Sequence, residues 1–142
     1  MNRRAIYVSI NPKATKKIEA GIKNHEFRNY IPKKYLNCLY VYETAPTSKL
    51  KYVIDLGEII KYPDKLELEG DGNEDFNIGN KTKYAYALKA IYKLLEPIEL
   101  EMLKRDFNFL PPQAFAYDKK YPLLTETIEK AAKNNGILIC KK

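Results

Sequence analysis

Residues 23 to 28 gather the charged side chains best suited to chemistry. Glu26 and Arg28 are two positions apart, so on a strand they project from one face and can pair. Lys23 lies close to both, at the turn that leads into this strand. One acceptor beside several donors is what reading the edge of a base or holding a phosphate requires. The alternative is an exposed salt bridge of little energetic value, and spacing alone does not decide between the two.

The other residue types that often do chemistry are scarce. The chain has one histidine, His25, which should point away from Glu26 and is interpreted as structural rather than catalytic. A single histidine excludes mechanisms that need two imidazoles, such as that of an H-E-x-x-H zinc protease. Cys38 and Cys140 lack the number and spacing of a zinc site or a disulfide framework, so we predict no metal and no cofactor.

The net charge points to a polyanionic partner. The 142 residues carry 25 Lys and Arg against 18 Asp and Glu, a formal charge of +7. Residues 1 to 60 hold 11 basic and 5 acidic side chains, so six of these units lie in the segment that contains Lys23 and Arg28. A basic face attracts nucleic acid, although excess lysine is also a common aid to solubility.

Length and hydropathy predict one domain spanning residues 1 to 142. The longest apolar run is only a few residues, too short for the roughly 20 that cross a membrane. The apolar stretch after Arg4 stops at Asn11 and Pro12, short of the core of a signal peptide. With only two cysteines, a reduced cytoplasm is the expected location, without a membrane partner. The oligomeric state is left open.

The elements that must position the charged residues follow from local signals. Ala5 to Ile10 is β-branched and aromatic enough for a strand, and Asn11 followed by Pro12 is a helix start. A helix is therefore predicted over residues 12 to 20, ending before Gly21. The polar segment 24 to 29 then forms the second strand. The first helix is thus inserted between the first two strands.

Further strands are predicted at residues 36 to 43, 51 to 61 and 84 to 94, although the last also has helix-forming residues. The acidic, glycine-containing segment 63 to 80 reads as a long mobile loop. We expect Glu96 and Pro97 to end the preceding element, and Thr125 to cap a helix over residues 125 to 134. Residues 137 to 140 are a candidate edge strand. The whole is a strand-rich α+β domain.

Three segments in the first 60 residues resemble the ASCH domain family of the PUA-like superfamily: Ser9-Ile10-Asn11-Pro12, Ile18-x-x-Gly21-x-Lys23-x-x-Glu26-x-Arg28 and Tyr40-x-Tyr42-x-Thr44-Ala45-Pro46. The segment Pro112-Gln113-Ala114-Phe115 is similar to one that some members have near their end. The resemblance implies a PUA-like small mixed β-barrel flanked by helices. It also implies a cleft where the first helix, the signature strand and the T-A-P turn meet.

Members of that family are proposed to bind RNA or modified nucleotides. The resemblance therefore implies that Lys23, Glu26 and Arg28 bind such a ligand, with four further residues around the same cleft: Ser9, Asn11, Tyr42 and Thr44. An unstacked base would then stack on a tyrosine while Glu26 accepts a hydrogen bond from its exocyclic amine. The expected partner is RNA, another single-stranded nucleic acid or a modified nucleotide.

Two other functions stay open at this stage. Some ASCH proteins are amidohydrolases that deacylate N4-acetylcytidine, and Lys23 aligns with their lysine, but Glu26 occupies the position of their threonine nucleophile. Thr44 or Ser9 would have to replace it. Alternatively, Glu26 and Lys23 would act as general acid and base in RNA cleavage. A third function is that of an interaction module whose acidic segment, residues 63 to 80, contacts a protein.

Overall fold

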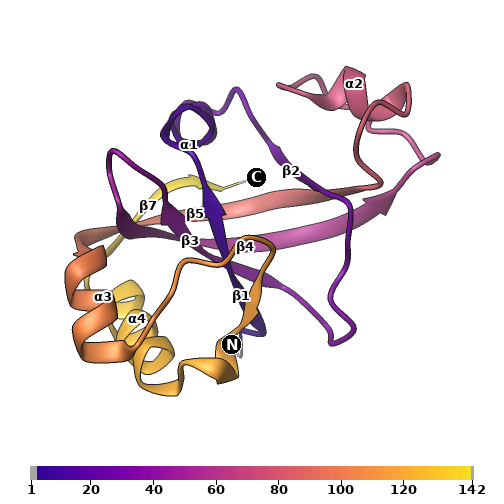
Figure 1. Cartoon of the computed structure of the whole chain (residues 1–142). Coiled ribbons are helices and arrows are strands. Elements are labelled where there is room, and N and C mark those ends of the chain that lie inside the picture. Colours follow the sequence, from indigo (N-terminus) through magenta and orange to yellow (C-terminus); the bar gives the residue numbers. More distant parts are fainter. Residues whose placement is uncertain (1–2, 142) are drawn as a thin grey trace.

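The fold is a mixed sheet curved into a half-barrel with helices packed around it (Figure 1). This computed structural model describes residues 3–141, and side chains as far as residue 133. The strands are β1 Ala5–Ile10, β2 His25–Arg28, β3 Cys38–Glu43, β4 Lys49–Lys61, β5 Tyr84–Glu99, β6 Ala116–Tyr117 and β7 Gly136–Lys141. The helices are α1 Pro12–Glu19, α2 Asn73–Asn77, α3 Leu100–Phe107 and α4 Pro122–Asn135, with a 3₁₀ turn at Asp118–Lys120.

The strand order is β2-β5-β4-β3-β1-β6, and β7 pairs with β5. Among the described strands only β1 and β3 run parallel, because α1 and β2 lie between them in the chain and return it to the same end of the sheet. The other pairs are antiparallel. The predicted α+β class, the PUA-like small barrel and the helix inserted between β1 and β2 are confirmed.

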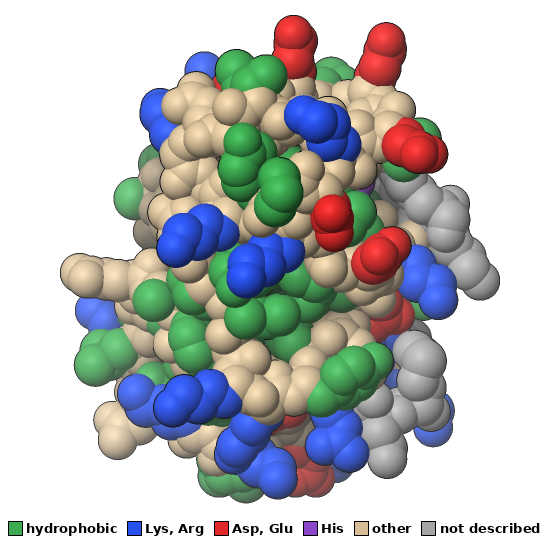
Figure 2. All heavy atoms as spheres, turned by 90° about the vertical axis from the view of Figure 1, so that its right-hand side faces the viewer, with side chains coloured by type: hydrophobic (Ala, Val, Ile, Leu, Met, Phe, Trp, Pro, Cys, Tyr) green, Lys and Arg blue, Asp and Glu red, His purple; other side chains and the backbone are tan. Residues whose placement is uncertain are grey.

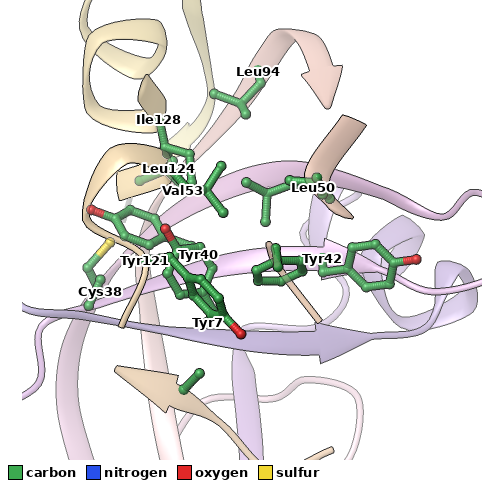
Figure 3. Close-up of a cluster of buried hydrophobic side chains, with 14 of the residues drawn as sticks. Tyr7, Cys38, Tyr40, Tyr42, Leu50, Val53, Leu94, Tyr121, Leu124 and Ile128 are labelled. Atoms are coloured by element: carbon green, nitrogen blue, oxygen red, sulfur yellow. The ribbon is translucent and has the colours of Figure 1, made fainter. Parts of the chain in front are cut away.

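The sheet buries side chains on both faces. Ile6, Val8 and Ile10 of β1 face the inside of the half-barrel, where they pack with Ile54 and Tyr86 among others. The alternate residues pack under α3 and α4, and Figure 3 shows this second cluster, with Tyr7, Tyr40 and Tyr121 beside Leu124 and Ile128. Period-two alternation therefore places neighbouring residues of one strand in two different cores.

The acidic segment 63 to 80 differs from the long mobile loop that was predicted. It contains α2, and Phe76 of that helix is buried with Leu66 against Ala85 of β5. Asn73 is also buried and donates hydrogen bonds to Asn24 Oδ1 and Leu68 O. A few buried apolar and amide side chains thus hold this acidic segment in contact with the barrel.

Two predicted boundaries were wrong. The strand β5 does not end at Glu96 and Pro97 but continues to Glu99, because the ladder with β4 shifts register before Leu50 pairs with Ile98 and so accommodates the proline. Thr125 does not cap the last helix, which begins three residues earlier at Pro122, a residue that favours the first helical position. The Thr125 hydroxyl instead donates to Asp118 O over 2.8 Å.

Residues 137 to 140, predicted as an edge strand, belong to β7, which pairs with the outer part of β5. Of the described helices, none combines the length and the apolar character needed to cross a membrane.

Candidate nucleic-acid site

The first helix sets the position of Lys23. Asn11 caps α1 by accepting a hydrogen bond from Ala14 N over 2.8 Å, as its sequence position predicted. Gly21 follows the helix in the left-handed region, with φ of +78°, which glycine adopts without strain. The carbonyl of Lys17 then accepts hydrogen bonds from the backbone N–H groups of Ile22 and Lys23. This closed turn directs Lys23 toward β2.

The strand β2 brings Glu26 and Arg28 to one face. They lie opposite Tyr86 and Tyr84 of β5, and the Arg28 Nε and Nη2 atoms are 2.9 Å and 2.7 Å from Glu26 Oε2. Lys23 Nζ is 3.8 Å from Glu26 Oε1. Lys23, Glu26 and Arg28 are therefore one cluster, which we call the charge triad.

The charge triad is not the exposed salt bridge that the spacing also allowed. The side chains of Lys23, Glu26 and Arg28 are 10%, 11% and 13% exposed. Charged groups removed from water to this extent carry a desolvation cost of several kcal/mol each, unlike surface pairs. Their placement is thus energetically significant, and each change of charge within the cluster should have a measurable effect.

The charges of the triad do not balance, because two cations share one carboxylate. Arg28 takes the closer contacts with Glu26, which leaves Lys23 with the longer one. Within the part of the chain that the structure describes, the Lys23 ammonium has this ion pair and a position 4.7 Å from the centre of the Phe27 ring, but no hydrogen bond. A nearly buried ammonium in this state has donors available for an oxygen of a ligand.

Arg28 also connects β2 to β1. Its Nη2 atom donates to the backbone carbonyl of Ser9 over 3.3 Å, whereas the Ser9 hydroxyl donates to Pro112 O over 2.7 Å. Ser9 thus reaches the charge triad through its main chain. The backbone N–H of Thr44 donates to Ile10 O, which places the T-A-P turn beside the end of β1 where Asn11 caps α1.

Tyr42 is not brought to the charge triad. It belongs to the core under α3 and α4, where its ring centre is 6.1 Å from that of Phe109, and Figure 3 shows it beside Leu50. The inward-facing residues of β3 are Leu39 and Val41. The expectation that Tyr42 lines the same cleft as Glu26 is therefore corrected by the alternation of β3.

The aromatic neighbour of the triad is instead Tyr30, which the sequence reasoning missed. Its ring centre is 6.0 Å from the Arg28 guanidinium carbon, and its backbone carbonyl accepts a hydrogen bond from the Tyr86 hydroxyl. Burial raises the pKa of the Tyr30 hydroxyl, so it stays protonated at neutral pH. Glu26, Arg28 and Tyr30 follow one another at period two, the signal by which Tyr30 could have been found.

His25 stacks its ring on that of Phe27, with 6.4 Å between the ring centres. It is buried, its Nδ1 atom is 2.7 Å from Asn24 Oδ1, and Asn24 in turn binds Asn73 of the 63 to 80 segment. Among the residues whose side chains are described, no group of three His, Cys, Asp or Glu is arranged to hold a metal ion.

The fold and part of the sequence are shared with solved structures. The crystal structure of ASCH from Zymomonas mobilis matches with a TM-score of 0.62 and 26% identity, over 94% of this chain and 97% of that one. A serine-to-alanine mutant of the same protein matches with a TM-score of 0.61 and 27% identity, over 92% and 96%. A tyrosine-to-phenylalanine mutant matches with 0.62 and 26%, over 94% and 99%.

No protein-family model matches the sequence, and no curated protein matches it either. The relationship therefore rests on the solved structures, which share the fold over more than nine-tenths of each chain and about a quarter of the residues. This combined likeness of fold and sequence to ASCH proteins supports the resemblance to the ASCH domain family that the sequence motifs indicated.

Proposed function

We propose that the protein binds RNA, single-stranded DNA or a modified nucleotide at the charge triad. The observation that carries the proposal is the Lys23 ammonium, nearly buried beside Glu26 and without a hydrogen bond among the described residues. The likeness to solved ASCH structures supports a nucleic-acid-related function at the level of that family. The excess of positive charge in residues 1 to 60 supports it independently.

The triad offers a base both kinds of hydrogen-bonding partner. A carboxylate has about four acceptor positions, and Arg28 uses the Oε2 side of Glu26 while Oε1 faces Lys23. Glu26 can therefore accept from an exocyclic amine, while Lys23 donates to a carbonyl or phosphate oxygen. Tyr30 is the tyrosine placed to stack on the base, because its ring lies beside Arg28.

Fluorescence anisotropy with short RNAs, single-stranded DNAs and modified nucleosides tests the proposal. We expect Glu26→Ala and Arg28→Ala to weaken binding about tenfold or more, as for a lost charge-assisted hydrogen bond. The matched controls are Glu58→Ala and Arg105→Ala, which change the same residue types on the exposed surface. Thermal unfolding of each variant separates lost binding from lost folding. Equal affinities for wild type and folded triad variants would refute the proposal.

The two hydrolase alternatives would act at the same site. In the amidohydrolase version Ser9 or Thr44 would supply the nucleophile, and the structure shows the Ser9 hydroxyl donating to Pro112 O. In the ribonuclease version Glu26 and Lys23 would exchange protons with a ribose 2′-hydroxyl. Mass analysis of labelled RNA and acetylated nucleosides after incubation distinguishes these reactions from binding. Intact substrates at high protein concentration would remove both alternatives.

A further inference from the structure

A row of partly exposed rings leads away from the charge triad. It starts at Tyr30, whose ring centre is 5.1 Å from that of Phe115 with the planes inclined by 24°. Phe115 is followed by Tyr117 at 5.2 Å, edge to face. Arg28 stands over the Tyr30 end and Lys34 over the Tyr117 ring, 6.0 Å and 5.2 Å from the respective centres. We call Tyr30, Phe115 and Tyr117 the aromatic stripe.

The aromatic stripe joins the two ends of the sheet. Tyr30 follows β2 and Tyr117 closes β6, and these two strands stand at opposite ends of the strand order. The Tyr30 hydroxyl donates to Ala114 O over 2.7 Å and fixes the first ring in place. All three rings are half-buried, and Phe115 and Tyr117 pack with one side against the core inside the half-barrel, so the stripe covers this core and keeps part of its surface toward solvent.

The far end of the stripe opens into a basic hollow of about 260 Å³. Its lining includes Tyr117, Lys34 and Tyr35, and Tyr35 is 72% exposed. Arg4 and Lys119 add further exposed cations to the same hollow. The one carboxylate in the lining, Asp118, is engaged with backbone, because its two oxygens accept from Ala5 N and Lys119 N.

The side of the molecule that carries β2 and α2 is divided by charge. Figure 2 shows hydrophobic side chains through the middle of this side, Lys and Arg beside them and below, and most Asp and Glu in the upper half. The acidic segment 63 to 80 is at the upper end in Figure 1. A polyanion on this side is therefore repelled at one end and attracted toward the other.

We propose that a single strand of nucleic acid lies along the aromatic stripe, with one base at the charge triad and its neighbours running to the basic hollow. This rests on the proposed function and extends it from one nucleotide to a strand. The parts of these half-buried rings that remain exposed can stack only on unpaired bases, which favours a single strand over a duplex. The cations at both ends of the stripe, Arg28 and Lys34, complement phosphates.

Anisotropy with oligonucleotides of one to about eight nucleotides, and with a duplex of the same sequence, tests the strand. For wild type we expect affinity to rise with length and the duplex to bind less tightly than the single strand. Lys34→Glu and Tyr35→Ala should each weaken the longer strands by about tenfold and leave a mononucleotide within about twofold. Both residues are exposed, so these variants should fold. Lys104→Glu, an exposed lysine on α3, is the charge-matched control.

The outcomes separate this inference from the proposed function. If a mononucleotide binds but affinity does not grow with length, or Lys34→Glu behaves like Lys104→Glu, the strand along the stripe is refuted and the triad site stands. If the duplex binds as tightly as the single strand, stacking on the stripe is refuted. If neither mononucleotide nor strand binds, both proposals fall together. A length dependence lost only in Lys34→Glu and Tyr35→Ala supports the inference.

Discussion

Replacing Lys23 by methionine should abolish ligand binding while leaving the protein as stable as before. Methionine keeps the unbranched stem beside Phe27 and removes only the ammonium. At 3.8 Å from Glu26 Oε1, that ammonium gains about 4 kcal/mol of attraction at an effective dielectric constant of about 20. Its desolvation at 10% exposure costs several kcal/mol, and it also meets the like charge of Arg28. In the free energy of unfolding, the attraction to Glu26 is thus nearly cancelled by desolvation and by the repulsion from Arg28.

The variant also leaves Glu26 and Arg28 as a neutral pair at 2.7 Å. We therefore expect Lys23→Met to change the free energy of unfolding by no more than about 1 kcal/mol in either direction. Glu26→Gln should lower the stability, because it removes the negative charge of the triad and leaves two nearly buried cations. Its expected cost is about 3 to 5 kcal/mol, the range for breaking a buried pair from one side.

Urea unfolding of wild type, Lys23→Met, Glu26→Gln and the double variant measures these changes. In the double variant, part of the loss caused by Glu26→Gln should be recovered, because Arg28 is then the only remaining cation. A loss of more than about 2 kcal/mol in Lys23→Met would show that Lys23 is held for stability, and a neutral Glu26→Gln would show that the triad is solvated. Either result would refute the reasoning.

Three further predictions concern the rest of the molecule. Phe76→Ala should cost about 3 to 5 kcal/mol or free the 63 to 80 segment, which limited proteolysis would detect as new cleavage there; unchanged resistance and stability would contradict it. Burial raises the pKa of Glu43, but hydrogen bonds from Thr15 and Thr47 and the charge of Lys51 outweigh it and hold the pKa below its ordinary 4.5. Stability should therefore fall as the pH drops through and below 4.5, with a shallower fall in Glu43→Gln; parallel pH profiles would contradict this. Burial raises the pKa of four tyrosines well above 10: Tyr7, Tyr40, Tyr52 and Tyr86. The stability of the protein should therefore fall as the pH rises past 10, and tyrosinate absorbance should show these side chains ionising only when the protein unfolds.

Local chemistry made part of the fold and of the site predictable. Asn11 and Pro12 specify the start of α1 because an amide cap and a proline act within one turn, and the structure has both. The pairing of Glu26 with Arg28 needs only the period of a strand. Both predictions depend on residues that are neighbours in the chain.

The remaining errors arose where distant contacts decide. Every residue of β3 is buried, so polarity does not reveal which face Tyr42 occupies, and only the packing of α3 and α4 assigns it. Phe76 is one apolar residue in an acidic segment, and its burial depends on Ala85 of β5. The aromatic stripe joins Tyr30 to Phe115 across the barrel. Phe115 directly precedes β6, whose two residues are too few to give a recognisable strand pattern in the sequence.

The most direct test of the triad is a titration of the isotope-labelled protein with a single-stranded pentanucleotide, followed by nuclear magnetic resonance. The triad site predicts saturable shifts of the Arg28 Nε–H signal and of the backbone amides of residues 23 to 28, all lost in Lys23→Met. Shifts confined to exposed lysines such as Lys104, or shifts at residues 23 to 28 that persist in Lys23→Met, would contradict it.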